Sequence, residues 1–118
     1  MILLVEDEAP ARHAFAQILR NHGHEVMEVA DGQEALELLE HYDFGLVITD
    51  LVIPRLNGFL LVAQIRSTRP CMPVLLISGC FSEDAERIIS SESVEFMHKP
   101  IDPFDLIDAV QRLVPKSG

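Results

Sequence analysis

The chain has 118 residues, of which 48% are hydrophobic and 24% are charged, and this length and composition favour one globular domain over a disordered chain. Its 19 acidic and 9 basic residues give a formal net charge of −10, which argues against direct binding of nucleic acid because phosphate contacts need a basic face. No apolar run is long enough for membrane insertion, and the two cysteines suit a reduced protein, so we expect a cytoplasmic location.

The first part of the chain predicts two strands, each followed by a helix. The apolar run 2–5 is typical of a parallel strand covered on both faces, and it ends in the acidic run 6–8. Pro10 suits the first turn of a helix that ends near 21–23. A second strand is expected over 24–30, and Asp31-Gly32 precedes the second helix. The apolar faces expected for these helices consist of Ala14, Phe15, Ile18 and Leu19, then Ala35, Leu36 and Leu39.

The central strand is expected over 46–49 and runs straight into Asp50. Pro54 and Gly58 follow, so the chain turns at once and leaves this carboxylate at the carboxyl end of the strand. Open α/β sheets bind their ligands at that end. A helix-compatible run then covers 59–66.

The last part of the chain continues the alternation of strands and helices. Strands are expected over 73–77 and 94–98, a short polar helix from Ser82, and a last helix from Asp102-Pro103. The apolar face of the last helix is expected to consist of Phe104, Leu106, Ile107, Val110 and Leu113. The pattern predicts an α/β fold in one domain, 1–118: a doubly wound, five-stranded parallel sheet with five helices on both faces.

Polar residues that follow the strands are expected to meet at one edge of such a sheet. They are Glu6 and Asp7 after the first strand, Asp50 after the third, Ser78 after the fourth and Lys99 after the fifth. Clustered carboxylates repel one another and suit a hard cation such as Mg²⁺. With a lysine and a hydroxyl donor beside it, a carboxylate here is suited to accept a phosphoryl group.

These motifs resemble the receiver domain of two-component response regulators over essentially the full length of the chain. The matching motifs are Glu6-Asp7, Asp50 with Pro54 and Gly58, Ser78-Gly79 and Lys99-Pro100. Each is weak alone, but together, in this order and near these spacings, they are highly specific. The resemblance implies the flavodoxin-like strand order 2-1-3-4-5.

The resemblance also assigns an acceptor and a metal site. It implies that Asp50 accepts the phosphoryl group. Glu6, Asp7, Asp50 and the carbonyl of Val52 would hold Mg²⁺. The Lys99–Pro100 peptide bond would be cis, which would aim the lysine inward.

Further roles follow from the same resemblance. Lys99 and the hydroxyl of Ser78 would contact the phosphoryl group, together with the backbone amides of Val52 and Gly79. Ser78 and Phe96 would form the switch pair that reports phosphorylation to the face of the fourth helix, fifth strand and fifth helix. The alternative for Phe96 is a core residue without a switching role.

Two other functions are disfavoured by particular residues. Hydrolases with an aspartyl nucleophile usually have a second acid two positions after it, where this chain has Val52. A flavodoxin-type module needs a first turn rich in Ser, Thr or Gly, whereas this first turn is the acidic run 6–8, which repels phosphate.

We therefore expect a signalling switch that catalyses only its own phosphorylation and dephosphorylation. Its phosphodonor would be a histidine kinase or phosphotransfer protein, and its downstream target is not readable from the residues. An alternative is a receiver domain excised from a hybrid histidine kinase or a larger response regulator, acting in a phosphorelay. Few basic residues are available to compensate an acidic dimer face, so a monomer is expected.

Overall fold

The computed structural model describes residues 1–51, 58–79 and 94–114. Five strands and four helices lie in these ranges, in the order β1 (Ile2–Val5), α1 (Ala9–Asn21), β2 (Val26–Val29), α2 (Gly32–His41), β3 (Leu46–Asp50), α3 (Gly58–Thr68), β4 (Val74–Ser78), β5 (Val94–His98) and α5 (Pro103–Leu113). The strands form one parallel sheet in the order β2-β1-β3-β4-β5, which confirms the predicted fold. The helix expected from Ser82 lies outside the described residues.

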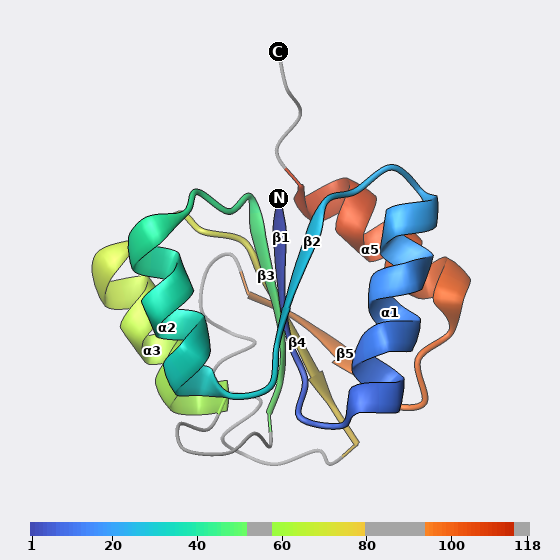
Figure 1. Ribbon diagram of the computed structural model, residues 1–118, viewed down its shortest axis with the longest axis horizontal. Coiled ribbons are helices and arrows are strands. Elements are labelled where there is room, and N and C mark those ends of the chain that lie inside the picture. Colours follow the sequence, from blue (N-terminus) through green and yellow to red (C-terminus); the bar gives the residue numbers. More distant parts are fainter. Residues whose placement is uncertain (52–57, 80–93, 115–118) are drawn as a thin grey trace.

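The sheet forms the middle of three layers. Helices α1 and α5 cover one of its faces, and α2 and α3 cover the other (Figure 1). Because all five strands are parallel, their carboxyl ends lie along a single edge, and α1 begins at that edge. None of the helices in the described ranges is both long and apolar enough to span a membrane.

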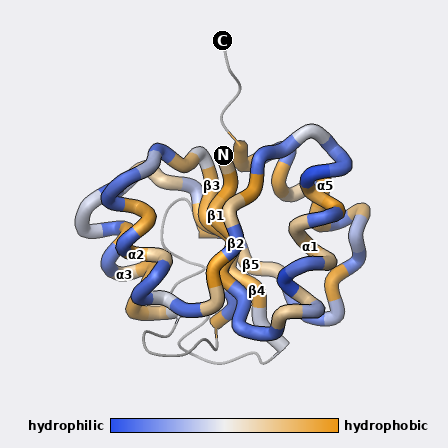
Figure 2. Tube along the Cα trace, viewed as in Figure 1, coloured by the Kyte–Doolittle hydropathy of each residue, from blue (hydrophilic) through white to orange (hydrophobic). Residues whose placement is uncertain are grey.

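The apolar strands are explained by helices on both faces. In β1, Leu3 and Val5 belong to one buried cluster, whereas Ile2 and Leu4 belong to a second cluster on the opposite face. Successive side chains of a strand point to opposite faces, so a sheet covered on both sides needs apolar residues at every position. Figure 2 shows this hydrophobic centre, with polar residues on the outer sides of the helices.

Local signals in the sequence set three of the helix ends. The side chain of Asp31 accepts a hydrogen bond from the amide of Glu34 at 2.8 Å and caps α2. Asp102 caps α5 in the same way, through the amide of Phe104 at 2.8 Å. Gly23 has a φ of 88° just after α1, a conformation that glycine adopts without strain. These ends agree with the predicted ones.

Two residues expected in the core lie at the surface instead. Phe104 is 79% exposed, and Ala14 is exposed while its neighbour Ala16 is buried. Both errors have the same cause. Each residue turns an α-helix by about 100°, so Phe104 lies on the side of α5 opposite to its buried residues, and Ala14 lies opposite to the buried side of α1.

The second strand is shorter than expected and covers only Val26–Val29. The amide of His24 donates to the carbonyl of Leu19 at 3.1 Å, so this residue belongs to the turn that closes α1. The weak alternation of apolar residues did not locate the start of the strand. His24 could begin the strand or close the helix, and its backbone amide is used by the helix end.

Candidate functional site

A pocket of about 260 Å³ opens at the carboxyl edge of the sheet. It is lined by Glu6, Asp7, Glu8, Asp50, Ser78, Gly79 and Lys99. The described residues that the sequence assigned to the acceptor, the metal and the phosphoryl contacts all lie in this set. Val52, predicted to contribute its carbonyl and amide, lies outside the described residues.

Asp50 ends the central strand and is 7% exposed. Its strand lies between β1 and β4, and the next amide, that of Leu51, still donates to the carbonyl of Ile77 at 2.9 Å. The hydroxyl of Thr49 donates to the carbonyl of Asp50 at 2.9 Å. The backbone that carries the carboxylate is therefore fixed on both sides by hydrogen bonds.

The start of α3 presses against this strand end. The amide of Gly58 donates to the carbonyl of Leu51 at 2.9 Å. A Cβ atom at position 58 would lie 2.6 Å from the carbonyl oxygen of Asp50 and 2.8 Å from Cα of Leu51, distances that real Cβ atoms do not tolerate. Glycine is required here so that the helix can approach the backbone of the acidic residue.

Lys99 follows β5 and reaches the acids across the neighbouring strand. Its ammonium nitrogen donates to Oδ2 of Asp50 at 2.5 Å and lies 3.7 Å from Oε2 of Glu6. The backbone is anchored by a 2.9 Å hydrogen bond from the Lys99 amide to the carbonyl of Ser78, and the Lys99–Pro100 peptide bond is cis. Burial alone would lower the pKa of Lys99, but the hydrogen bond to Asp50 and the surrounding acids raise it, so the ammonium stays charged.

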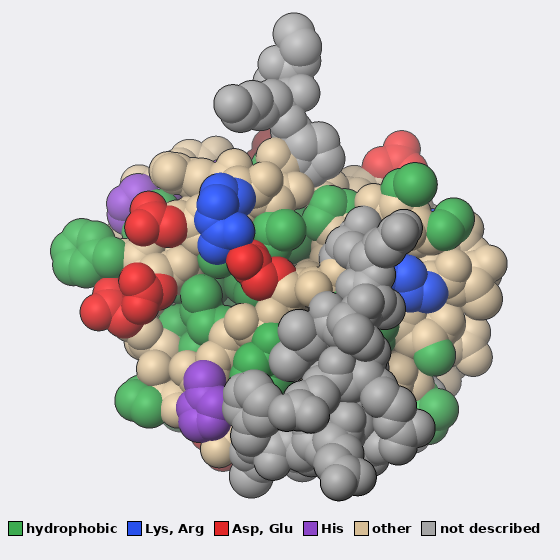
Figure 3. All heavy atoms as spheres, turned by 180° about the vertical axis from the view of Figure 1, so that it is seen from behind, with side chains coloured by type: hydrophobic (Ala, Val, Ile, Leu, Met, Phe, Trp, Pro, Cys, Tyr) green, Lys and Arg blue, Asp and Glu red, His purple; other side chains and the backbone are tan. Residues whose placement is uncertain are grey.

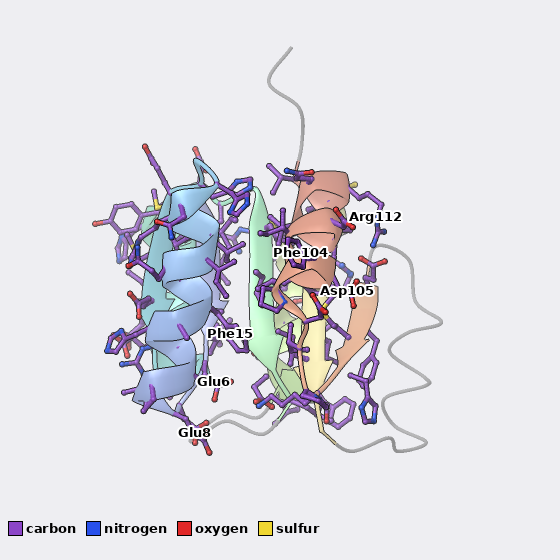
Figure 4. All side chains as sticks on the ribbon, turned by 90° about the vertical axis from the view of Figure 1, so that its right-hand side faces the viewer. Glu6, Glu8, Phe15, Phe104, Asp105 and Arg112 are labelled. Carbon is purple, nitrogen blue, oxygen red and sulfur yellow. The ribbon has the colours of Figure 1, made fainter. Side chains whose placement is uncertain are left out.

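Glu6 is a buried carboxyl with a perturbed pKa. Its residue is 2% exposed, and the amide of Glu8 donates to its Oε1 atom at 3.3 Å. Burial, followed by the hydrogen bond and the negative charge of Asp50, raises the pKa of Glu6 to about 7. Asp7, next in the chain, is exposed. Figure 4 shows Glu6 and Glu8 together where the chain enters α1.

The donor set fits a hard divalent cation. Glu6 and Asp50 are buried together, and the ammonium of Lys99 lies between them, 3.7 Å from Oε2 of Glu6 and 2.5 Å from Oδ2 of Asp50, so two carboxyl groups share one positive charge. Mg²⁺ typically takes one or two carboxylates and keeps several waters. In the part of the chain that the structure describes, no group of three His, Cys, Asp or Glu side chains is placed to hold a metal ion, so a cation here would directly take at most two of these carboxylates together with backbone oxygens and waters.

Phe96 is not among the residues that line the pocket. It is half-buried in β5 and packs against the core cluster on the α2 and α3 side. Its ring centroid lies 6.3 Å from that of His98, with an angle of 65° between the rings. Ser78 pairs with His98 in the β4–β5 ladder, so the two predicted switch residues lie on adjacent strands and two positions apart in register. Their role as a switch stays a prediction.

Two charged residues near the pocket, Glu8 and Arg12, were not predicted from the sequence. Glu8 lines it, and its place in the acidic run 6–8 could have included it. The guanidinium of Arg12 donates to the backbone carbonyl of Glu6 at 3.0 Å, a contact for which the sequence offers no local signal. On the face shown in Figure 3, basic side chains stand apart from one another among acidic and hydrophobic ones.

Comparisons with known proteins agree on one family. A family model described as the response regulator receiver domain matches residues 2–111. The transcriptional regulatory protein PdtaR of Mycobacterium tuberculosis is 35% identical over 117 residues, which cover 98% of this chain and 57% of PdtaR. The sensor kinase CckA of Brucella abortus is 32% identical over 119 residues, which cover 98% of this chain and 12% of the kinase. The chain thus spans little more than half of the first relative and a small part of the second.

Solved structures agree with these sequence relatives. The receiver domain of NtrX from Brucella abortus matches with a TM-score of 0.86 and 31% identity, covering 99% of this chain and 100% of that one. The chemotaxis response regulator CheY4 of Vibrio cholerae also gives a TM-score of 0.86, with 28% identity and coverage of 96% and 97% of the two chains.

Proposed function

The chain belongs to the response regulator receiver domain family, and on that premise we propose that it is a phosphoryl-accepting switch in which Asp50 takes phosphate from a phosphohistidine donor. The observation that carries the proposal is the buried carboxylate of Asp50, held by the ammonium of Lys99 at 2.5 Å in an open pocket beside Glu6. Residues 1–118 would form a single receiver domain.

The reaction needs placement and charge neutralisation more than further covalent chemistry. A carboxylate oxygen of Asp50 forms a bond to phosphorus while the phosphorus–nitrogen bond of phosphohistidine breaks. The electron pair of that bond stays on the imidazole nitrogen, and Asp50 becomes an acyl phosphate. Lys99 neutralises negative charge on the transferring group, and the hydroxyl of Ser78 and the amide of Gly79, which line the same pocket, donate to its oxygens.

Glu6, Asp7, Asp50 and the carbonyl of Val52 would hold Mg²⁺, which the receiver family generally uses for phosphorylation. When bound, the cation neutralises the negative charge that gathers between the acids and the phosphoryl oxygens. The buried pair of Glu6 and Asp50, with an incompletely compensated charge, supports this assignment. Ser78 and Phe96 would then report the phosphorylated state to the neighbouring surface of β5 and α5.

A histidine kinase or a phosphotransfer protein would supply the phosphoryl group to a monomeric receiver. A second role has one observation in its favour, since CckA, a sensor kinase by name, matches nearly the whole chain. In that role the domain would pass its phosphate on to a phosphotransfer protein. Incubation of the phosphorylated domain with such a protein tests the relay role, which requires that the phosphate move from Asp50 to a histidine of the partner.

The proposed function is tested by intact-mass measurement after incubation with Mg²⁺ and acetyl phosphate. We expect a single phosphate adduct that is labile to base and that does not form when the metal is chelated beforehand. Asp50→Asn has nearly the same shape but a weakly nucleophilic amide, so it should give no adduct. Modification of Asp50→Asn to the same extent as the wild type would place the acceptor elsewhere and overturn the proposal.

A further inference from the structure

Arg12 connects the acidic pocket to the edge of the sheet. It lies in the first turns of α1, and its side chain is only 16% exposed. One guanidinium nitrogen, Nη1, donates to the carbonyl oxygen of Glu6 at 3.0 Å. Another, Nε, lies 3.5 Å from Oε1 of Glu28 in β2. A single side chain thus bridges the acid at the end of β1 and an acid on the neighbouring edge strand.

The contact from Arg12 completes the positioning of Glu6. The amide of Glu6 donates to the carbonyl of Val29 at 3.1 Å. Its side-chain oxygens are held separately, Oε1 by the amide of Glu8 at 3.3 Å and Oε2 by the ammonium of Lys99 at 3.7 Å. The guanidinium of Arg12 donates to the remaining polar atom of Glu6, its carbonyl oxygen. This carbonyl belongs to the peptide unit between Glu6 and Asp7, so its orientation sets the direction of both acids.

Glu28, which contacts Arg12, is itself held in place by two further side chains. Its Oε2 atom accepts from Nη1 of Arg20 at 2.9 Å, and Nδ1 of His13 lies 2.7 Å from Oε1. Burial opposes ionisation of Glu28, but the hydrogen bonds from Arg20 and His13 outweigh it and lower its pKa. The carboxylate therefore stays ionised at neutral pH and keeps Arg12 in place.

The geometry requires arginine rather than any positive charge. A guanidinium is a rigid planar fork, so Nε and Nη1 can serve two acceptors at a fixed angle. The ammonium of a lysine at the same position is a single centre on a flexible stem. It can neutralise Glu28, but it cannot hold the carbonyl of Glu6 in a fixed direction at the same time.

We propose that Arg12 is a positioning residue for the divalent-cation site, which it serves by fixing the peptide that carries Glu6 and Asp7. The inference rests on the proposed function, because the cation site is part of it. Outer contacts that orient metal ligands commonly change metal affinity by about 10–100-fold when they are removed. A contact to the backbone between two ligands belongs to this class of interaction.

The chain contains a matched control for a purely structural role. Arg20 lies on the same helix and binds the same carboxylate of Glu28, and its other nitrogen donates to the carbonyl of Val26 at 2.8 Å. No contact that the structure describes joins Arg20 to Glu6. Arg20→Ala removes a positive charge and an α1–β2 ion pair, but it leaves the contacts of Glu28 with His13 and Arg12 and the contact of Arg12 with the carbonyl of Glu6.

The experiment measures the dissociation constant of Mg²⁺ by calorimetry for the unphosphorylated chain, well below the melting temperature of each variant. Arg12→Ala is expected to bind Mg²⁺ about tenfold more weakly than the wild type. Arg20→Ala should stay within about twofold, because distant effects of this kind are small. Arg12→Lys keeps the charge and the aliphatic stem, and it should bind as weakly as Arg12→Ala. If Arg12→Ala does not fold, the Mg²⁺ affinity of Arg12→Lys tests the inference instead.

Amide hydrogen exchange in the metal-free protein gives a second readout. The amide of Glu8, which donates to Glu6, should exchange faster in Arg12→Ala than in Arg20→Ala. Wild-type Mg²⁺ affinity in Arg12→Ala, equal weakening in both alanine variants, or full affinity in Arg12→Lys would each overturn the inference. A wild-type protein that binds no Mg²⁺ at all would be a different failure, because it removes the proposed metal site itself.

Discussion

The ammonium nitrogen of Lys99 lies 2.5 Å from Oδ2 of Asp50, although 49 positions separate the two residues in the chain. Asp50 ends β3 and Lys99 follows β5, so the width of β4 lies between their backbones. Adjacent strands are about 4.8 Å apart, and the side chains must therefore span about 10 Å between them. Only a long, flexible cation at position 99 can meet the carboxylate from there.

Lys99→Ala should slow phosphorylation by about 100-fold, the lower range observed when one donor to a developing negative charge is removed. The rate of adduct formation with acetyl phosphate, followed by intact mass at saturating Mg²⁺, measures the effect. Lys99→Arg keeps the charge but replaces a compact ammonium with a wider planar group, and it should restore little of the rate. If Lys99→Ala forms the adduct at a rate within about threefold of the wild type, the contact between Lys99 and Asp50 plays no part in transfer.

Gly58→Ala should destabilise the protein by about 1–3 kcal/mol, the usual cost of an atom forced into a packed site. The added Cβ would meet the Asp50 carbonyl at 2.6 Å, a contact that only movement of the backbone can relieve. Urea unfolding gives the free-energy difference. Gly79→Ala is the control, since among the described residues its Cβ would meet only Cβ of Lys99 at 3.9 Å. Equal stability of the two variants would contradict the steric argument.

Phe104 and Leu106 allow a comparison of two apolar residues on one helix. Phe104 is 79% exposed, so Phe104→Ser should change the free energy of unfolding by no more than about 0.5 kcal/mol. Leu106 is fully buried, and Leu106→Ala should cost about 2–5 kcal/mol through lost burial and a cavity. Denaturant titration of both variants checks the ranking. A larger loss for the serine variant would mean that Phe104 is covered in solution.

The raised pKa of Glu6 predicts how the metal-free protein responds to pH. Its pKa rises from 4.5 to about 7 on folding, so between these values the folded protein holds a proton that the unfolded chain has released. Raising the pH through this window therefore reduces stability. Glu6→Gln is neutral throughout, and its stability relative to the wild type should increase from about pH 5 to about pH 8 in a chelator. Urea unfolding at both pH values measures this difference, and a difference independent of pH would exclude an ionisation penalty at Glu6.

The prediction of the pocket from the sequence depended on one regularity of parallel sheets. Apolar runs marked the strands, and the residues after them, Asp50, Ser78 and Lys99, had to meet because every strand ends at the same edge. No tertiary contact was needed for that inference. The same regularity explains why the buried faces of β1 could be predicted at every position.

Arg12 and Phe104 show where sequence reasoning stopped. A charged residue in a helix normally predicts a solvated face, and the partners of Arg12, on β1 and β2, are set by how α1 packs on the sheet. Phe104 is apolar and close to other apolar residues, yet its place around the helix axis directs it outward. The spacing of hydrophobic residues near a helix start predicts that a helix forms there better than it predicts which side of that helix is buried.

The distribution of the pocket residues along the chain has a consequence for biosynthesis. Glu6 follows β1 and Lys99 follows β5, so this cluster of charges depends on contacts between residues far apart in sequence. A ribosome-bound nascent chain that has not yet released β5 carries the acids of the pocket without their ammonium partner. Non-local contacts of this kind form late in folding. The arrangement proposed for phosphoryl transfer therefore requires that β1, β3, β4 and β5 have all assembled.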